Sequence, residues 1–329
     1  TKNAKNSGQF GKFSAGYGTD DKYILGANVN FFKEQRRITV LAMSNNINQQ
    51  NFQADNISGG SGGSQGMGGR GQGMQAGPQS GVFNTNAIGF NYTNAWGKKV
   101  NLNASYFWNN GTTTTNKISD RQYILGGDAN QYYNEISRST NENTNHRFNL
   151  RLEYNIDTNN SIILQPRFSL QDNNSVSDLL TKTSNEPSYI QDSLLNIADN
   201  HNNGKGPGYN FNNDFLYRHK FNKKGRTLSI NLGTGVTNRN RDSYLNNNSI
   251  YYHQLAGQIS DSTDQYGKAL ASGLSLSSNV IYTEPVGKNS QLQANYNISW
   301  SRNDNDKKTY DYASDRQDYT NFNDSLSNI

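Results

Sequence analysis

The chain has 329 residues, enough for one large domain or two smaller ones, yet only 32% of it is hydrophobic, which is low for a packed globule. It contains no cysteine, which excludes a disulfide framework and a thiolate zinc site. The formal net charge of +5 is spread along the chain without a concentrated basic patch, so no nucleic-acid partner is expected.

Aromatic residues still make up 11% of the chain, which is more than disordered chains usually carry. No run approaches the roughly 18 to 20 apolar residues of a membrane helix. The opening segment TKNAKNSGQFGK has no signal-peptide pattern, so we expect either a cytosolic protein or a missing N-terminus. The observations below favour the second.

Alternation of apolar and polar residues predicts β-strands along the chain. In VNLNASYFW, from Val100, the apolar residues fall on one face of a strand and Asn and Ser on the other, whereas a helix would scatter them. RFNLRLEYNI, RTLSINLG and QLQANYNISW repeat the pattern. It predicts eleven strands, at 10–17, 23–32, 37–49, 82–96, 99–110, 146–156, 161–171, 210–221, 226–238, 273–286 and 290–301.

The connections between these strands alternate between two kinds. Short polar turns are predicted at Lys33–Arg36, Gly97–Lys98, Asp157–Asn160, Asn222–Gly225 and Gly287–Asn289. Long polar loops are predicted at 50–81, 111–145, 172–209, 239–272 and from 302 onward. A compact soluble domain rarely tolerates several such loops, whereas a transmembrane barrel has tight turns on one side and long loops on the other.

The predicted fold is therefore all-β, an antiparallel transmembrane β-barrel with short periplasmic turns and long extracellular loops, in preference to a β-sandwich. Most strands have about the length that a tilted strand needs to cross a bilayer. Aromatic residues near both strand ends are expected to form the interfacial girdles: Phe31, Trp96, Phe221 and Tyr282 near the short turns, and Tyr106, Trp108 and Trp300 toward the other end. Because bacterial barrels have an even number of strands, eleven strands indicate a fragment of a larger barrel or a miscounted barrel of about ten or twelve.

Candidate functional residues are few. We expect no catalytic constellation, metal site or cofactor, because no Ser-His-Asp set, paired carboxylates or close histidine pair can be argued from spacing. The glycine-rich run Ser58–Gly81 is expected to be an outward loop, and GKGPGYN (Gly204–Asn210) the end of another. Charged residues on predicted inward faces either contact a plug or are simply solvated: Arg147, Arg151, Glu153, Arg167, Asp214, Arg218 and Lys220.

One segment carries a resemblance to a known family. GQFGKFSAGYGTDDKYILGANVNFFKEQRRITVLAMSNNINQQNF, Gly8–Phe52, resembles the first barrel strands of Bacteroidetes TonB-dependent receptors. More narrowly, it is similar to the outer-membrane β-barrel family that often carries an N-terminal carboxypeptidase-regulatory-like domain. Arg37-Ile38-Thr39-Val40 and Ser44-Asn45-Asn46-Ile47-Asn48 fill the family's strand pattern, and Phe83–Trp108 is also similar.

The resemblance implies the first part of a barrel of about 22 strands, with 1–7 as the plug-to-barrel connection and 8–329 as partial barrel. It implies a Gram-negative outer membrane with extracellular loops, and active uptake of a ligand powered by TonB through a plug domain absent from this chain. Outer-membrane lipid and a surface lipoprotein are the further partners implied. The alternatives are a non-transport outer-membrane scaffold and a soluble extracellular glycan-binding β-protein.

Overall fold

The computed structural model describes residues 7–48, 81–125, 130–253, 257–287 and 290–328. These residues form twelve β-strands and two short 3₁₀ helices, Gln191–Ser193 and Asp324–Leu326. The strands are β1 (Ser7–Tyr17), β2 (Tyr23–Lys33), β3 (Arg36–Asn45), β4 (Val82–Trp96), β5 (Val100–Tyr123), β6 (Gln131–Asn155), β7 (Asn160–Ser184), β8 (Leu194–Lys220), β9 (Thr227–His253), β10 (Gly257–Pro285), β11 (Gln291–Ala313) and β12 (Asp318–Phe322).

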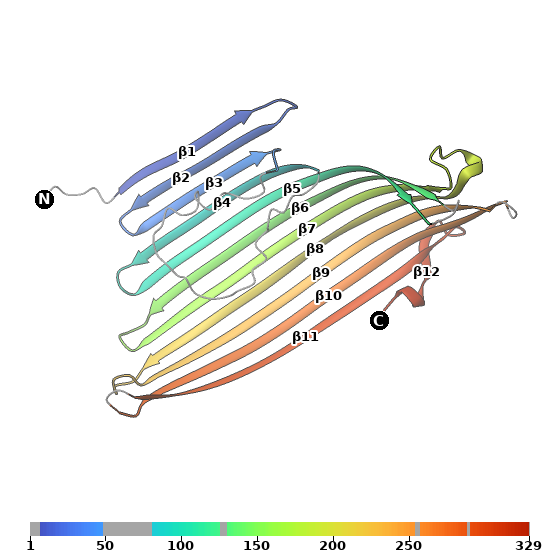
Figure 1. Ribbon diagram of the computed structural model, residues 1–329. Coiled ribbons are helices and arrows are strands. Elements are labelled where there is room, and N and C mark those ends of the chain that lie inside the picture. Colours follow the sequence, from blue (N-terminus) through green and yellow to red (C-terminus); the bar gives the residue numbers. More distant parts are fainter. Residues whose placement is uncertain (1–6, 49–80, 126–129, 254–256, 288–289, 329) are drawn as a thin grey trace.

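All twelve strands form one antiparallel sheet in which each strand pairs with its neighbours in sequence. Figure 1 shows the sheet as a single curved layer, with β1 along one edge and β11 and the short β12 along the other. The prediction of an all-β antiparallel fold is confirmed. Within the described residues the sheet is not closed, because β1 and β12 each pair on one side only.

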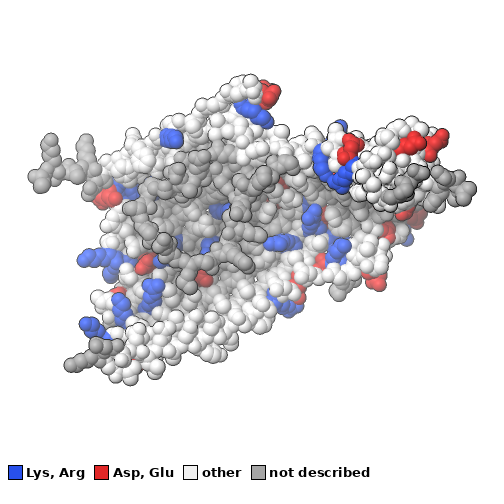
Figure 2. Space-filling view, viewed as in Figure 1, with Lys and Arg blue, Asp and Glu red and all other residues white. Residues whose placement is uncertain are grey.

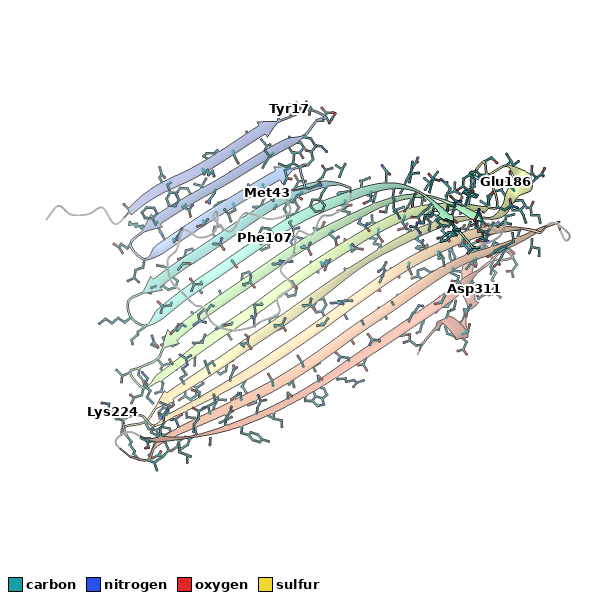
Figure 3. The ribbon with its side chains drawn as sticks, viewed as in Figure 1. Tyr17, Met43, Phe107, Glu186, Lys224 and Asp311 are labelled. Atoms are coloured by element: carbon teal, nitrogen blue, oxygen red, sulfur yellow. The ribbon has the colours of Figure 1, made fainter. Side chains whose placement is uncertain are left out.

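Short turns join the strands at one end of the sheet, as predicted, although 288–289 of the predicted turn Gly287–Asn289 lie outside the described residues. Glu34 and Gly97 have φ of 55° and 61°, the left-handed region that tight hairpin turns require. In the β6–β7 turn, Asp157 Oδ1 accepts hydrogen bonds from the backbone N–H groups of Asn159 and Asn160 at 2.7 and 2.8 Å. Figure 3 places Lys224, in the β8–β9 turn, at this end of the sheet and Glu186 and Asp311 at the opposite end.

The prediction of long loops is wrong wherever the structure describes them. β5 to β11 each contain 23 to 29 residues, so the segments predicted as loops at 111–145, 172–209, 239–272 and from 302 are largely strand. The backbone ladder continues through polar sequence, with Thr113 opposite Asn141 and Thr114 opposite Thr140. The predicted loop at 50–81 and the predicted connection at 1–7 lie almost wholly outside the described residues; only Gly81 and Ser7 are described, and Ser7 begins β1.

The register places the apolar residues of neighbouring strands side by side in a band across one face. Across β5 and β6, Leu102 lies opposite Leu152 and Tyr106 opposite Phe148. The band continues as Phe148–Phe168–Phe211–Val236–Leu274 from β6 to β10 and reaches β2 and β3 through Val40 and Val29. In β5 it runs from Val100 to Trp108 and in β11 from Leu292 to Trp300, and polar residues follow on the same face. We call this surface the apolar band.

The apolar band is not the core of a packed domain. Among the described residues, the buried hydrophobic side chains are only Leu41, Met43, Ala87, Ile163 and Ala313. Band residues are instead exposed: 65% for Leu292 and Tyr296, 54% for Ile298 and 52% for Trp300. An apolar surface that runs across ten or more strands is far larger than the patches that soluble monomers expose.

Candidate functional site

The charged residues predicted to face inward all lie on the polar face, opposite the apolar band. Arg147, Arg151 and Glu153 of β6 alternate with the band residues Phe148, Leu150 and Leu152. The remaining four occupy the same face of β7 and β8: Arg167, Asp214, Arg218 and Lys220. In the view of Figure 2, charged side chains of both signs are scattered over the molecule and do not gather into one acidic or basic patch.

The structure brings some of these residues together. The Arg167 guanidinium donates to the Asp214 carboxylate across β7 and β8. Arg151 lies 3.5 Å from Glu153. The Arg167 and Asp214 side chains are 54% and 42% exposed, so we expect about 0 to 1 kcal/mol of stability from this pair. Arg147 has no ion pair with any described residue and lies further from the short turns.

Arg147 contributes to a second group of residues that contains two unpredicted arginines. A cavity of about 470 Å³ opens on the polar face between β6 and β9. Three arginines line it, with amide and hydroxyl side chains and no aspartate or glutamate among the described lining residues: Arg147, Arg239, Arg241, Asn145, Ser169, Gln171, Asn173 and Asn210. Gly206, Pro207, Gly208 and Asn240 complete the lining. We call this the arginine cavity.

The backbone of β8 makes room for the arginine cavity. The β8–β9 ladder runs up to Lys205 opposite Asp242, resumes at Gly208 opposite Arg239, and is interrupted between them. A Cβ on Gly206 would lie 2.0 Å from the carbonyl oxygen of Asn240, so only glycine fits there. A Cβ on Gly204 would lie 2.9 Å from Arg241 Nη2, so the bare backbone lets this guanidinium lie over β8.

Amide groups form the other wall of the cavity. The side chains of Gln171 and Asn173 both donate to Asn143 Oδ1, at 3.0 and 2.9 Å, which fixes them across β6 and β7. Asn145 is only 6% exposed, and its Nδ2 group has no hydrogen-bond partner among the described residues. A buried amide donor without a partner is uncommon in proteins, and the residue that carries it lines this cavity.

Sequence reasoning missed most of the arginine cavity. Arg239 and Arg241 lie in a segment predicted to be a loop, and GKGPGYN was expected to end a loop, whereas the structure places both in paired strands. The signal was present as spacing by two, with glycine at 204, 206 and 208 and arginine at 239 and 241. Side chains two apart share one face of a strand.

Comparison with protein-family models and with curated proteins finds no match for this chain. No group of histidine, cysteine or acidic side chains that could hold a metal ion occurs among the described residues. The same part of the chain has no helix long and apolar enough to cross a membrane.

The aromatic residues predicted to form two girdles lie at the two edges of the apolar band. Trp96 ends β4 and Tyr282 lies near the end of β10, both beside short turns, and Phe31 and Phe221 occupy similar places. Phe221 contacts Tyr282, with 6.3 Å between ring centroids. The other edge carries Tyr106, Trp108 and Trp300. Their role at a lipid interface stays a prediction.

A charged network fixes the short-turn end of β8 to β10. Arg226 Nε and Lys223 Nζ lie 2.7 and 2.6 Å from the Glu284 carboxylate oxygens. Tyr282 also donates to Glu284, at 2.7 Å. Both carboxylate oxygens of Glu284 accept hydrogen bonds from side chains of neighbouring elements, so the network holds the turn in place.

A tyrosine cluster occupies the opposite end, on the same face as the apolar band but beyond it. Tyr244 lies 5.0 Å from Tyr266 and 5.6 Å from Tyr319 between ring centroids. The hydroxyl of Tyr266 donates to Asp242 at 2.6 Å and that of Tyr319 to Asp264 at 2.7 Å. Burial, and then the hydrogen bond to Asp264, raise the pKa of Tyr319 to about 12.

Proposed function

We propose that this chain forms part of the wall of an outer-membrane β-barrel that takes up a ligand, as TonB-dependent receptors of the Bacteroidetes type do. The observation that carries the proposal is the apolar band, which crosses the sheet on one face and is exposed instead of packed. The other face of the same strands carries arginine, asparagine and serine.

The height of the apolar band supports lipid as its partner. Val100 to Trp108 and Leu292 to Trp300 each span nine residues, and about 9 to 11 residues of a tilted strand cross a bilayer. In this proposal the short turns face the periplasm, and the polar upper halves of β5 to β11 stand outside the cell.

The open edges of the sheet point to a larger wall. Unpaired backbone groups in hydrocarbon cost several kcal/mol each, so membrane-spanning sheets close into barrels. β1 and β12 each have one unpaired side within the described residues. We infer that further strands pair with these edges and close the sheet around a polar lumen.

Transport rests on the resemblance of Gly8–Phe52 to TonB-dependent receptors. Such a barrel needs polar contacts between its lumen and a plug, and Arg151, Glu153, Arg218 and Lys220 lie on the polar face near the short turns. These residues are the proposed plug contacts. TonB would act through that plug from the periplasmic side.

Cysteine labelling in isolated outer membranes tests the membrane proposal. This chain has no cysteine, so single cysteines can be added to the full-length protein without a background from this region. Asn149→Cys and Leu150→Cys are adjacent in β6 on opposite faces within the apolar band. We expect a water-soluble maleimide to modify Asn149→Cys and to leave Leu150→Cys unmodified, because lipid covers only the band.

Two further positions on the same strand provide the matched control. Ser139→Cys and Thr140→Cys also lie on opposite faces of β6 but beyond the band, so both should react. Equal and rapid labelling of Leu150→Cys and Asn149→Cys would contradict membrane insertion and favour a soluble extracellular protein. Equal labelling after denaturation would show that both thiols are intrinsically reactive.

TonB dependence needs a separate experiment. If the barrel is a receptor, chemical crosslinking in intact cells should recover TonB with the full-length protein, and a variant lacking the plug should not recover it. A membrane-inserted barrel that never crosslinks to TonB would instead be a non-transport scaffold.

A further inference from the structure

We propose that the arginine cavity binds a small ligand that carries oxyanion groups, such as a carboxylate, sulfate or phosphate. The inference deepens the proposed function, on which it rests in taking the polar face as a lumen through which a ligand passes. It assigns the substrate a chemical class and names the residues that recognise it.

The charge of the arginine cavity favours an anionic ligand. Arg147, Arg239 and Arg241 line one space, none forms an ion pair within the described part of the chain, and no carboxylate there lines the cavity. Like charges that share a cavity repel one another, and an anion relieves that repulsion. Two other cations on this face do have acidic partners, since Arg167 pairs with Asp214 and Lys117 pairs with Glu135.

The geometry of the hydrogen-bond donors in the arginine cavity also favours an oxyanion. Guanidinium groups present planar pairs of N–H donors that match the oxygens of carboxylates, sulfates and phosphates. The unpartnered Nδ2 group of Asn145 adds a donor that is already buried at the wall. A ligand oxygen there would satisfy a group that otherwise bears a desolvation cost.

The backbone of β8 leaves room for a ligand beside Arg241. Gly204 and Gly206 remove side chains from β8 where Arg241 lies, and the interruption of the β8–β9 ladder exposes backbone beside it. The resulting cavity of about 470 Å³ falls within the usual range for small-molecule sites. Ser169, Asn210 and Gln171 can hydrogen-bond hydroxyl groups, so an acidic sugar or hydroxy acid fits this lining best.

The arginine cavity lies at and beyond the upper edge of the apolar band. Arg147 alternates with Phe148 at the upper edge of the apolar band, and Arg239 and Arg241 lie beyond that edge, away from the short turns. In the proposed orientation this is the extracellular half of the lumen. An arriving ligand would therefore meet the arginine cavity before any plug contact near the short turns.

Calorimetric titration of the purified full-length protein with citrate tests the proposal. Citrate carries three carboxylates and a hydroxyl, and glycerol serves as the uncharged probe. We expect citrate to bind, glycerol not to bind, and added NaCl to weaken citrate binding. Arg239→Gln and Arg241→Gln should each weaken citrate binding on the order of tenfold or more, because each removes a charged hydrogen-bond donor.

Two variants make the result specific. Arg138→Gln removes the same charge from β6 but on the opposite face, and it should leave citrate affinity unchanged. Ser169→Trp fills the cavity without removing an arginine, and it should weaken binding. Migration on unheated gels checks that each variant is folded.

The proposal is overturned if the folded protein binds no citrate, if Arg138→Gln weakens binding as much as Arg241→Gln, or if Ser169→Trp binds normally. This test needs neither lipid nor TonB, whereas the cysteine labelling needs no ligand. Normal citrate results with uniform cysteine labelling would keep the oxyanion site and reject the outer-membrane function, and the reverse pattern would do the opposite.

Discussion

At the scale of single residues, the polar half of the sheet is held by hydrogen bonds that water would otherwise satisfy. Asn110 illustrates this, because its amide donates to Glu142 and Thr144, both at 2.9 Å, from the neighbouring strand. Each such bond contributes about 1 kcal/mol or less in an exposed setting. The exceptions are side chains that also lose contact with water, and Tyr319 is one example.

Tyr319 gives a pH dependence whose sign can be worked out. Its pKa is raised in the folded state to about 12, against about 10 in an unfolded chain, so folding favours the protonated phenol. The stabilisation is complete below about pH 10 and is lost as the pH rises through about 12. We expect the phenol signal assigned by comparison with Tyr319→Phe to titrate near pH 12 in spectra of the folded protein.

Asp264 provides the test of the cause. Asp264→Asn removes the carboxylate that accepts the Tyr319 hydroxyl, so the pKa of Tyr319 should fall while remaining above 10, because burial is the larger cause. Asp20→Asn, in the β1–β2 turn at the other edge of the sheet, should leave it unchanged. Titration of Tyr319 near pH 10 in the unmodified protein would contradict this assignment.

At the scale of elements, the two halves of each long strand are specified in different ways. The halves near the short turns follow from alternation, since one face is apolar and a shift of one residue would reverse it. In the outer halves both faces are polar, as in the pairing of Thr112–Thr115 with Ser139–Glu142, so hydrophobic alternation carries no signal. Backbone pairing extends these halves, with support from polar side-chain hydrogen bonds between strands, which is why the predicted loops are strands.

The same difference between the strand halves decides which residues of the candidate site could be predicted from the sequence. Arg147 could be predicted because it alternates with Phe148 and Leu150, whereas Arg239 and Arg241 lie in a polar half without that reference. Pairing between strands decides which residues meet across a sheet, and a single sequence does not contain it. The pairing of β8 with β9 brings Gly204 beneath Arg241, although 37 residues separate them in the chain.

The interruption of the β8–β9 ladder gives a prediction at this scale. Gly206→Ala would place a methyl group 2.0 Å from the Asn240 carbonyl oxygen, so the two strands must separate locally. We expect a loss of about 1 to 3 kcal/mol in stability and faster tryptic cleavage after Arg239 or Arg241. Gly208→Ala is the control, because its nearest contact would be 3.2 Å, and it should be cleaved much more slowly; equal cleavage of the two variants would contradict the role of Gly206.

At the scale of the whole molecule, the placement of residues along the strands explains how a very polar chain can expose a large apolar surface. The mean hydropathy is −0.92, yet apolar residues are concentrated on one face of the half of each strand nearest the short turns. Each long strand has two faces, and each face has a half near the short turns and an outer half. The whole polar face and the outer half of the other face are suited to water. A sheet of this kind has no interior of its own, so its stability depends on lipid against the band and on paired edges.

The edges give the last prediction. If the proposed barrel is closed, β1 pairs with a further strand in the membrane-inserted full-length protein, so the backbone N–H groups of β1 that point away from β2 should exchange slowly with deuterium. In an open sheet these alternate N–H groups face water and exchange quickly, while those bonded to β2 remain protected. Residue-resolved hydrogen exchange measures both sets within one strand, and β7, paired on both sides, supplies the protected reference. Rapid exchange at every second residue of β1, with β7 fully protected, would show that this edge is unpaired and that the wall does not close there.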